Sequence, residues 1–475
     1  MTTARQLVHA YEAGLGRPLS AATDEPDPGA RLAATLPVWA LAAGSVAAAA
    51  ESANRFRAAA GLATVPVRLD PDRIAAAFGS ERLFRRDGRA PSVFAELSGF
   101  FRARDGWIRT HANYPHHRAR LTAAIGLSPD VTADAAIARF ASMSAAEIEE
   151  LATAGGAVAV RVRTEDEWAA SPPGVAAAAG PLVAIRPSEG TDADRARAAI
   201  HFRHAAGAGT PASSLGPPSA PTRLRSGTVA QPLRGVRVLD LTRVLAGPVA
   251  TRTLALLGAD VLRIDPPGLP EIEWQFQDTC QGKRSTLLDL RTDPVLFAEL
   301  LAAADVLVTG YRPGSLAAAG VRTDDRRGLI HARVCAWGEA GPWGARRGFD
   351  SIVQAASGIA LLEGGPDRPG ALPAQALDHG SGYLLAAGVM DALRARWADG
   401  LGREVRVSLA RTGAWLLAAG HRDADHPAAA PPDPHSATIH GEVTTAAPAF
   451  ADYPDYSAPA PPYGSAQPFW PEYSA

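Results

Sequence analysis

Residues 236–248 read VRVLDLTRVLAGP, and this stretch decides the fold of the chain. Its first six residues form a short apolar run, which is typical of a strand buried inside a parallel sheet. Gly247 and Pro248 then mark a turn, and residues 249–257 predict a helix. A strand, a turn and a helix in this order predict the first unit of a parallel α/β sheet.

The same alternation continues towards the C-terminus. Strand-like runs lie at residues 260–264, 305–309 and 331–337, and residues 294–303 predict a helix. Strands that alternate with helices indicate right-handed βαβ units. We therefore predict an α/β fold in which a large domain holds a doubly wound, mainly parallel, Rossmann-like sheet.

The N-terminal part of the chain has a less clear pattern, with a helix expected over residues 40–60 and a strand over residues 65–69. Further along, the helices expected at 133–141 and 145–154 and the strands expected at 107–110 and 157–162 predict a smaller α+β domain, which comes before the large one.

Changes in composition divide the chain into five segments. A stretch rich in Pro, Gly and Ser is typical of a linker, and Pro, Ala and Tyr dominate the last part of the chain. The predicted segments are a truncated repeat of the large-domain end at 1–80, the small α+β domain at 81–206, the linker at 207–232, the large domain at 233–420 and an extended tail at 421–475.

One internal repeat is visible. Residues 36–45 (LPVWALAAGS) align with residues 372–381 (LPAQALDHGS), and an Ala-rich helical stretch follows each copy. Chance similarity between Ala-rich helices is the alternative. In a true repeat, Ala42 of the first copy stands where the second copy has Asp378, so only the second copy carries a carboxylate.

The composition excludes several classes of protein. With 47% hydrophobic and 20% charged residues, the 475-residue chain can bury a sizeable core. Its net charge of -2 provides no basic field for nucleic acid or for an anionic membrane. Residues 33–50 are the most apolar stretch, but their Ala, Gly and Pro content favours a buried helix over a membrane span. Residues 1–12 are polar and do not resemble a signal peptide.

Neither a disulfide framework nor a metal site is expected. Cys280 and Cys335 are the two cysteines and form no CxxC pair, so a reducing, cytoplasmic location is expected. His111, His116 and His117 lie close in sequence, but no carboxylate or Cys completes the group at the spacing of metal ligands. No metal is therefore predicted.

Two motifs follow predicted strands, at the sheet edge where open α/β folds bind ligands. Residues 244–248 (VLAGP) either hold an anion at a helix N-terminus or form a simple turn. Arg312 suits a phosphate, or it is a solvated loop residue. Lys283, the single lysine, lies in GKRS, which does not match a phosphate-binding P-loop.

Asp378 stands near the expected start of a helix. A carboxylate there either caps the helix or faces a ligand, and the pattern alone leaves both readings open. The small residues Gly380 and Gly382 would let a ligand approach the carboxylate closely.

Taken in order, these motifs resemble the class III CoA-transferase family, the CaiB/BaiF type, which includes formyl-CoA transferase, carnitine CoA-transferase and the 2-methylacyl-CoA racemases. In that family the small domain usually follows the large one, whereas here it comes first. The resemblance rests on LRGVRVLDLT (233–242), VLAGP (244–248), LGADVLRIDPP (257–267), GKRSTLLDLRT (282–292), ADVLVTGYRPG (304–314), GFDSIVQAASG (348–358), the Asp378 segment and GREVRVSL (402–409).

The resemblance implies a catalytic role for Asp378. In the family this aspartate attacks an acyl-CoA thioester, forms a mixed anhydride and then carries CoA as an aspartyl thioester. Pro266 and Cys335 replace basic residues of some members, which leaves Arg291 and Arg312 as the expected cations beside CoA. The residues that match the family's CoA-binding positions are Leu245, Ala246, Leu288, Asp289, Leu290, Arg291, Gly310, Tyr311, Arg312, Ala336 and Trp337.

The function implied is a class III CoA-transferase that moves CoA from an acyl-CoA to a carboxylic acid, with CoA as substrate and product and with a homodimer expected. The sequence does not identify the donor or the acceptor. One alternative is an acyl-CoA racemase or isomerase, which Phe349 disfavours because racemases carry a proton-transferring His at this position. Another is an acyl-CoA-binding protein without turnover.

Overall fold

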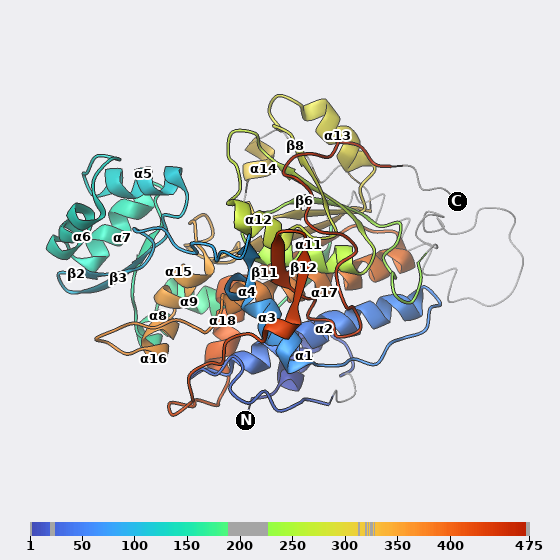
Figure 1. The fold of residues 1–475 in the computed structure, drawn as a ribbon, viewed down its shortest axis with the longest axis horizontal. Coiled ribbons are helices and arrows are strands. Elements are labelled where there is room, and N and C mark those ends of the chain that lie inside the picture. The colour runs from blue at the N-terminus through green and yellow to red at the C-terminus, as the bar shows by residue number, and fades with distance from the viewer. Residues whose placement is uncertain are drawn as a thin grey trace, which may run out of the picture.

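The computed structural model shows a large α/β body with a smaller domain beside it (Figure 1). It describes residues 2–471, apart from residues 20–23, 189–226, 312–313, 319–320, 322, 324–325 and 327. Most of the predicted linker therefore lies outside the described residues.

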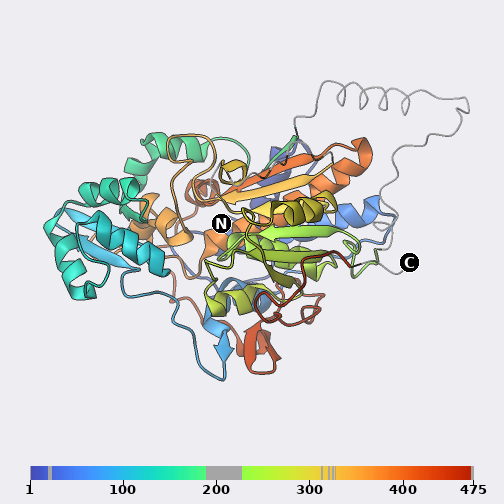
Figure 2. The ribbon, with the colours of Figure 1, turned by 90° about the horizontal axis from the view of Figure 1, so that it is seen from above.

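A seven-stranded sheet forms the centre of the large domain (Figures 1 and 2). Its order is β5-β11-β10-β9-β6-β7-β8, and all neighbours are parallel except the edge pair of β5 and β11. The prediction of a mainly parallel α/β sheet is confirmed. From β6 onward the strand order is that of a Rossmann fold, and it reverses between β6 and β9. The strands are β5 (Ala184–Pro187), β6 (Arg237–Leu241), β7 (Asp260–Asp265), β8 (Arg284–Leu287), β9 (Val306–Thr309), β10 (Ile330–Cys335) and β11 (Arg403–Ser408).

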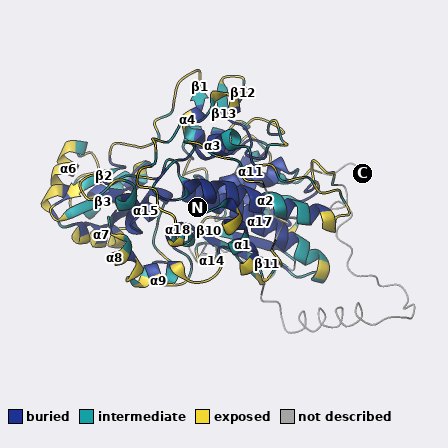
Figure 3. Cartoon of the chain, turned by 90° about the horizontal axis from the view of Figure 1, so that it is seen from below, coloured by how far each residue is buried: buried dark blue, intermediate teal, exposed yellow. Residues whose placement is uncertain are grey.

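Alternate residues of the central strands face different helices. Val238 of β6 belongs to the core that contains α2, α11 and α17, whereas Leu239 belongs to the core that contains α13. Because both faces are covered, these strands are continuously apolar in sequence. Buried residues accordingly dominate the centre of the large domain (Figure 3). The four helices are α2 (Val38–Ala59), α11 (Ala246–Leu256), α13 (Pro294–Ala302) and α17 (Ala376–Asp399).

The small domain has its own hydrophobic core. An antiparallel sheet of order β2-β3-β4 packs against three helices, and the domain lies at one end of the molecule (Figure 1). Its elements are β2 (Phe100–Ala103), β3 (Gly106–Thr110), β4 (Ala159–Arg161), α5 (Pro115–Ala124), α6 (Ala133–Ser142) and α7 (Ala145–Ala154).

A third sheet joins two distant parts of the chain. Its order is β1-β13-β12, so the segment that begins the small domain pairs with the C-terminal tail. Beyond this hairpin the tail runs along the large domain, where Ser465 pairs with Thr286 and Trp470 packs on the core beside β8. The expected extended tail therefore contains regular structure. The strands are β1 (Arg85–Arg86), β12 (Ala437–His440) and β13 (Val443–Ala446).

Within the described part of the chain, no helix combines the length and apolarity needed to cross a bilayer.

The other described helices connect the layers of the fold. These connecting helices are α1 (Ala4–Gly14), α3 (Pro71–Phe78), α4 (Ser80–Leu83), α8 (Glu165–Ala169), α9 (Pro172–Ala178), α12 (Glu273–Thr279), α14 (Ser315–Ala318), α15 (Asp350–Ala356), α16 (Ile359–Glu363), α18 (Leu409–Ala418) and the 3₁₀ turn η2 (Pro434–Ser436).

The strand expected at residues 65–69 is wrong, because this segment has no strand partner. The side chain of Asn54 on α2 makes the hydrogen bonds that a neighbouring strand would otherwise make. Its Oδ1 accepts a hydrogen bond from Val65 N–H at 2.9 Å, and its Nδ2 donates to Val65 C=O at 2.7 Å. The backbone groups of Val65 are satisfied without a strand.

The two copies of the internal repeat begin two long helices, α2 and α17, that pack against each other. A Cβ on Gly380 of α17 would lie 3.0 Å from Leu41 Cδ1 of α2, so glycine permits the close approach. Ala42 and Asp378 occupy equivalent positions in the two copies. Only α17 continues into a strand of the sheet.

Asp391 anchors α17 to the N-terminal helices. Its carboxylate is fully buried and accepts hydrogen bonds from Tyr11 Oη at 2.8 Å and Ser52 Oγ at 3.0 Å. It also pairs with Arg17 at 2.7 Å and Arg55 at 2.9 Å. Burial opposes ionisation, but the hydrogen bonds and charge of Arg55 outweigh it and hold the pKa of Asp391 below its usual value.

Asp391→Asn should lower the free energy of unfolding by about 3 kcal/mol, because it leaves two partly buried guanidiniums without their shared partner. The folded pKa lies below the unfolded value of about 3.9. The stabilisation by Asp391 is therefore complete at pH values above the unfolded pKa and is lost as the pH falls through the folded pKa. Urea unfolding at neutral and acidic pH measures both effects.

Asp452→Asn is the matched control, because Asp452 pairs with the exposed Arg68 at 4.0 Å. It should change stability by less than about 1 kcal/mol. Equal losses for the two variants would contradict the role assigned to Asp391.

Candidate active site

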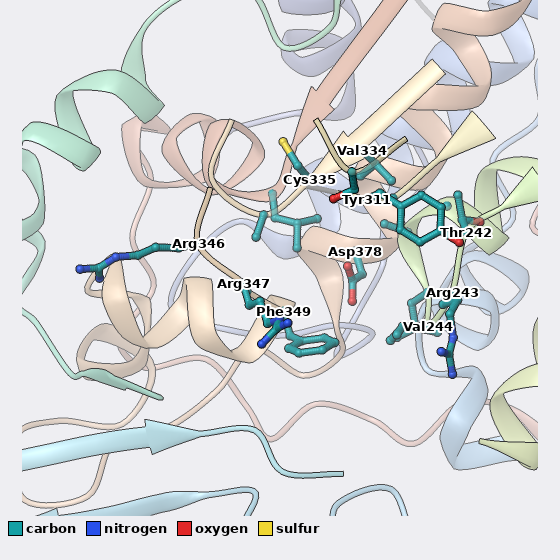
Figure 4. A pocket seen from close by; sticks show the side chains of 18 of the residues that line it. Thr242, Arg243, Val244, Tyr311, Val334, Cys335, Arg346, Arg347, Phe349 and Asp378 are labelled. Carbon is teal, nitrogen blue, oxygen red and sulfur yellow. The ribbon is translucent and has the colours of Figure 1, made fainter. Parts of the chain in front are cut away.

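A pocket of about 450 Å³ lies at the point where the strand order of the sheet reverses. Residues that follow β6 and β9 form its floor, which is where open α/β sheets bind ligands. Figure 4 shows Asp378 directed into this space, between Tyr311 and Val244 on one side and Phe349 on the other.

The turn after β6 is tightly constrained. Val244 has a φ of 69°, which is rare for a β-branched residue. Its N–H donates to Glu271 Oε2 at 2.9 Å. A Cβ on Gly247 would overlap the side chain of Thr242, so only glycine fits there. This turn places the first N–H groups of α11 at the pocket wall.

Asp378 lies in the first turn of α17 but does not cap the helix. The capping position is Gln375, which makes no side-chain cap. Asp378 is 7% exposed, and no side chain in the described ranges donates a hydrogen bond to its carboxylate or pairs with it. Of the two readings left open by the sequence, the geometry favours the one in which the carboxylate faces a ligand.

A second carboxylate, Asp350, holds the start of α17 in place. Its Oδ2 accepts a hydrogen bond from Asp378 N–H at 2.9 Å, and its Oδ1 accepts one from the Gln354 side chain. Burial raises the pKa of Asp350 to about 6. Burial, and then the charge of Asp350, raise the pKa of Asp378 well above its usual value.

The glycines next to Asp378 serve helix packing. A Cβ on Gly382 would lie 2.6 Å from Ala246 C=O, so Gly382 lets α17 approach α11, as Gly380 lets it approach α2. This corrects the expectation that these glycines open a path for a ligand. The two close contacts fix α17, and with it Asp378, against the sheet.

The small domain forms one wall of the pocket with Tyr114, His116 and His117. Tyr114 Oη donates to Glu271 Oε1 at 2.5 Å, which links the two domains beside the pocket. Burial lowers the pKa of His117 to about 3, so its ring is neutral at physiological pH. The described His, Cys, Asp and Glu side chains form no group that could hold a metal ion.

Three arginines line the pocket. The guanidinium of Arg243 lies over the Tyr114 ring at 5.2 Å. Arg346 points away from Asp378 and pairs with Glu149 at 3.0 Å, and Arg347 donates to Gly156 C=O (Figure 4). Cationic side chains at the mouth of such a pocket suit an anionic ligand.

The structure brings some of the residues predicted from the sequence together and leaves others apart. Leu245, Ala246, Gly310, Tyr311, Ala336 and Asp378 line the pocket. Trp337 lies behind it, where its Nε1 donates to Arg347 C=O at 3.1 Å. Leu288, Asp289, Leu290 and Arg291 follow β8 and are not among the lining residues, and the exposed Arg291 pairs with Asp289 at 2.9 Å. Arg312 lies outside the described residues.

Sequence reasoning missed the pocket residues that come from loops. Arg243, Arg346 and Arg347 belong to no motif with a fixed spacing, and the histidines were considered only as metal ligands. Among these arginines, Arg243 could have been predicted, because it directly follows a predicted strand and so lies at the sheet edge where ligands bind. Cys335 also lines the pocket, and burial raises the pKa of its thiol to about 11.

Comparisons with known proteins match this part of the chain. Residues 233–450 match the sequence model of CoA-transferase family III. The chain is similar to the probable fatty acyl-CoA transferase Rv3272 of Mycobacterium tuberculosis, with 35% identity over 200 residues, which are 38% of this chain and 51% of that protein. The crystal structure of Rv3272 covers 40% of this chain and 57% of its own, with 36% identity and a TM-score of 0.38.

Two other relatives are CoA-transferases by name. Succinyl-CoA:glutarate CoA-transferase of Mus musculus is 33% identical over 192 residues, which are 36% of this chain and 44% of that protein. Acetyl-CoA:oxalate CoA-transferase of Acetobacter aceti is 33% identical over 200 residues, which are 38% of this chain and 51% of that protein. The chain spans about half the length of these relatives. The matched residues 233–450 include β6 to β11 and Asp378, so this part of the chain is similar to CoA-transferase family III.

Proposed function

We propose that the protein transfers CoA between an acyl-CoA and a carboxylic acid, with Asp378 as the nucleophile. The observation that carries this proposal is the buried, unpaired carboxylate of Asp378 in the wall of a pocket at the strand-order reversal. The match of residues 233–450 to CoA-transferase family III and the names of the relatives support the same reaction class.

In the proposed reaction, an Asp378 carboxylate oxygen attacks the thioester carbonyl carbon, the C–S bond breaks and CoA leaves as a thiolate. The thiolate then attacks the carbonyl of Asp378 in the mixed anhydride, which releases the donor acid and leaves an aspartyl-CoA thioester. The acceptor acid reverses these steps. A carboxylate that water does not solvate is a stronger nucleophile, which suits the buried position of Asp378.

The surroundings of Asp378 supply the remaining groups. The N–H groups in the first turn of α11, beside Ala246 and Gly247, are the donors available for the oxyanion that forms during attack. Arg243 and Arg347 provide positive charge for the phosphates of CoA. The homodimer and the cytoplasmic location remain predictions.

Racemisation is the second reaction considered. Phe349 stands where the racemases of the family carry a histidine, and phenylalanine exchanges no proton. The His111 ring stacks on Phe349 with 3.7 Å between ring centroids, but burial lowers the pKa of His111 to about 3, which makes it a weak base. CoA transfer therefore remains the reaction that we propose.

Asp378→Asn should reduce exchange of labelled CoA into acyl-CoA to less than about 1% of wild type, because loss of a covalent route raises the barrier by several kcal/mol. Asp130→Asn, at an exposed loop residue, should keep full activity. Acyl-CoA followed by hydroxylamine should modify one carboxylate per chain, at Asp378, by peptide mapping. Modification near Ala42, or exchange retained by Asp378→Asn, would contradict the assignment.

The rate of exchange should rise with pH as Asp378 ionises, with a midpoint above the usual aspartate pKa. Asp350→Asn removes the neighbouring negative charge, so the pKa of Asp378 should fall and the acid limb should move to lower pH. A pH–rate profile of both proteins measures the shift. An acid limb that stays in place or moves to higher pH would show that Asp350 does not influence the nucleophile.

A further inference from the structure

A second, smaller cavity adjoins the large pocket at Asp378. It shares Asp378, Val244, Leu245 and Phe349 with the large pocket, and Glu81 of α4 is another of its lining residues. It leaves about 30 Å³ for the centres of water molecules. Such a space is large enough for at least one water molecule.

The walls of this cavity carry polar atoms that the protein does not satisfy. Gln275 Oε1, Trp274 Nε1 and His111 Nδ1 are buried without a hydrogen-bond partner. Gln275 is 6% exposed and His111 is 5% exposed. Unpaired buried groups are rare in proteins, and several of them around one small cavity indicate bound water.

Glu81 adds a group that can take a proton. No side chain among the described residues pairs with its carboxyl, which lines the cavity. Burial raises the pKa of Glu81 to about 7, against the opposing effect of its own backbone N–H. At neutral pH the carboxyl is therefore divided between its two protonation states, as an efficient general base requires.

We propose that the small cavity holds the water that hydrolyses the acyl-aspartate anhydride, with Glu81 as general base, so that the protein is also an acyl-CoA hydrolase. This inference rests on the proposed function, because it uses the intermediate formed on Asp378. The cavity adjoins the large pocket at Asp378, so water held there lies beside the anhydride.

The hydrolytic step balances with water as the co-reactant. The water oxygen attacks an anhydride carbonyl carbon while Glu81 accepts its proton. The bond between that carbon and the bridging oxygen breaks, which frees the donor acid and restores the Asp378 carboxylate. One proton goes to the CoA thiolate and one to solvent, so that acyl-CoA and water give the acid and free CoA.

The test uses the full chain with acetyl-CoA, succinyl-CoA and palmitoyl-CoA, and no acceptor acid. Free CoA is measured with a thiol reagent, and a single turnover in ¹⁸O-water locates the label in the released acid or in Asp378. Exchange of labelled CoA into acyl-CoA is measured in parallel, because exchange needs Asp378 but no water. We expect wild type to show both exchange and hydrolysis with at least one acyl-CoA.

Glu81→Gln should lower hydrolysis at least tenfold and leave CoA exchange within twofold of wild type. Trp274→Phe, which removes the indole N–H together with part of the ring, should also lower hydrolysis more than exchange. Glu96→Gln, at an exposed residue of the small domain, is the matched control and should change neither rate. Thermal melting of each variant shows that the protein is folded.

The outcomes separate the two proposals. Exchange without hydrolysis in wild type, or hydrolysis unchanged in Glu81→Gln, overturns the role of the cavity and leaves CoA transfer intact. Exchange retained by Asp378→Asn, or no exchange with any of the three acyl-CoAs, overturns the proposed function and this inference with it.

Discussion

The hydrogen bond from Asp378 N–H to Asp350 Oδ2 ties the start of α17 to the start of α15, and the site depends on it. It places two buried carboxyl groups together, and burial raises the pKa of both. Because Asp350 accepts the hydrogen bond from Asp378 N–H, the Asp378 carboxylate does not cap the helix. Asp378 is therefore held by its backbone, and its side chain faces the pocket.

Helix α17 is held along its whole length by parts of the chain that are distant in sequence. Gly380 and Gly382 bring it against α2 and α11 near the site, and Asp391 ties its other half to α1 and α2. The N-terminal segment thus completes the large domain although it precedes the small one. This arrangement explains how a chain with an unusual domain order still forms one continuous core on the face of the sheet that α2, α11 and α17 cover.

How far the sequence predicts the molecule depends on the range of the interactions involved. The strands around Leu239 and Val308 were predictable because burial on both faces makes the pattern local and apolar. The place of Asp378 near a helix start was predictable from the local pattern, and its catalytic role stays a prediction. The segment around Val65 was not, since a side chain of α2 replaces its strand partner. Glu81 reaches the site only through tertiary packing, and no local pattern records that.

Val244 has an energetic consequence for the relation between the two domains. A β-branched residue in the left-handed region carries strain on the order of 1–3 kcal/mol. Glu271 holds this backbone through one oxygen and Tyr114 of the small domain through the other. A motion that withdraws Tyr114 would therefore change the hydrogen bonding of the same glutamate that holds Val244. The position of the small domain and the strained turn beside Asp378 share this one carboxylate.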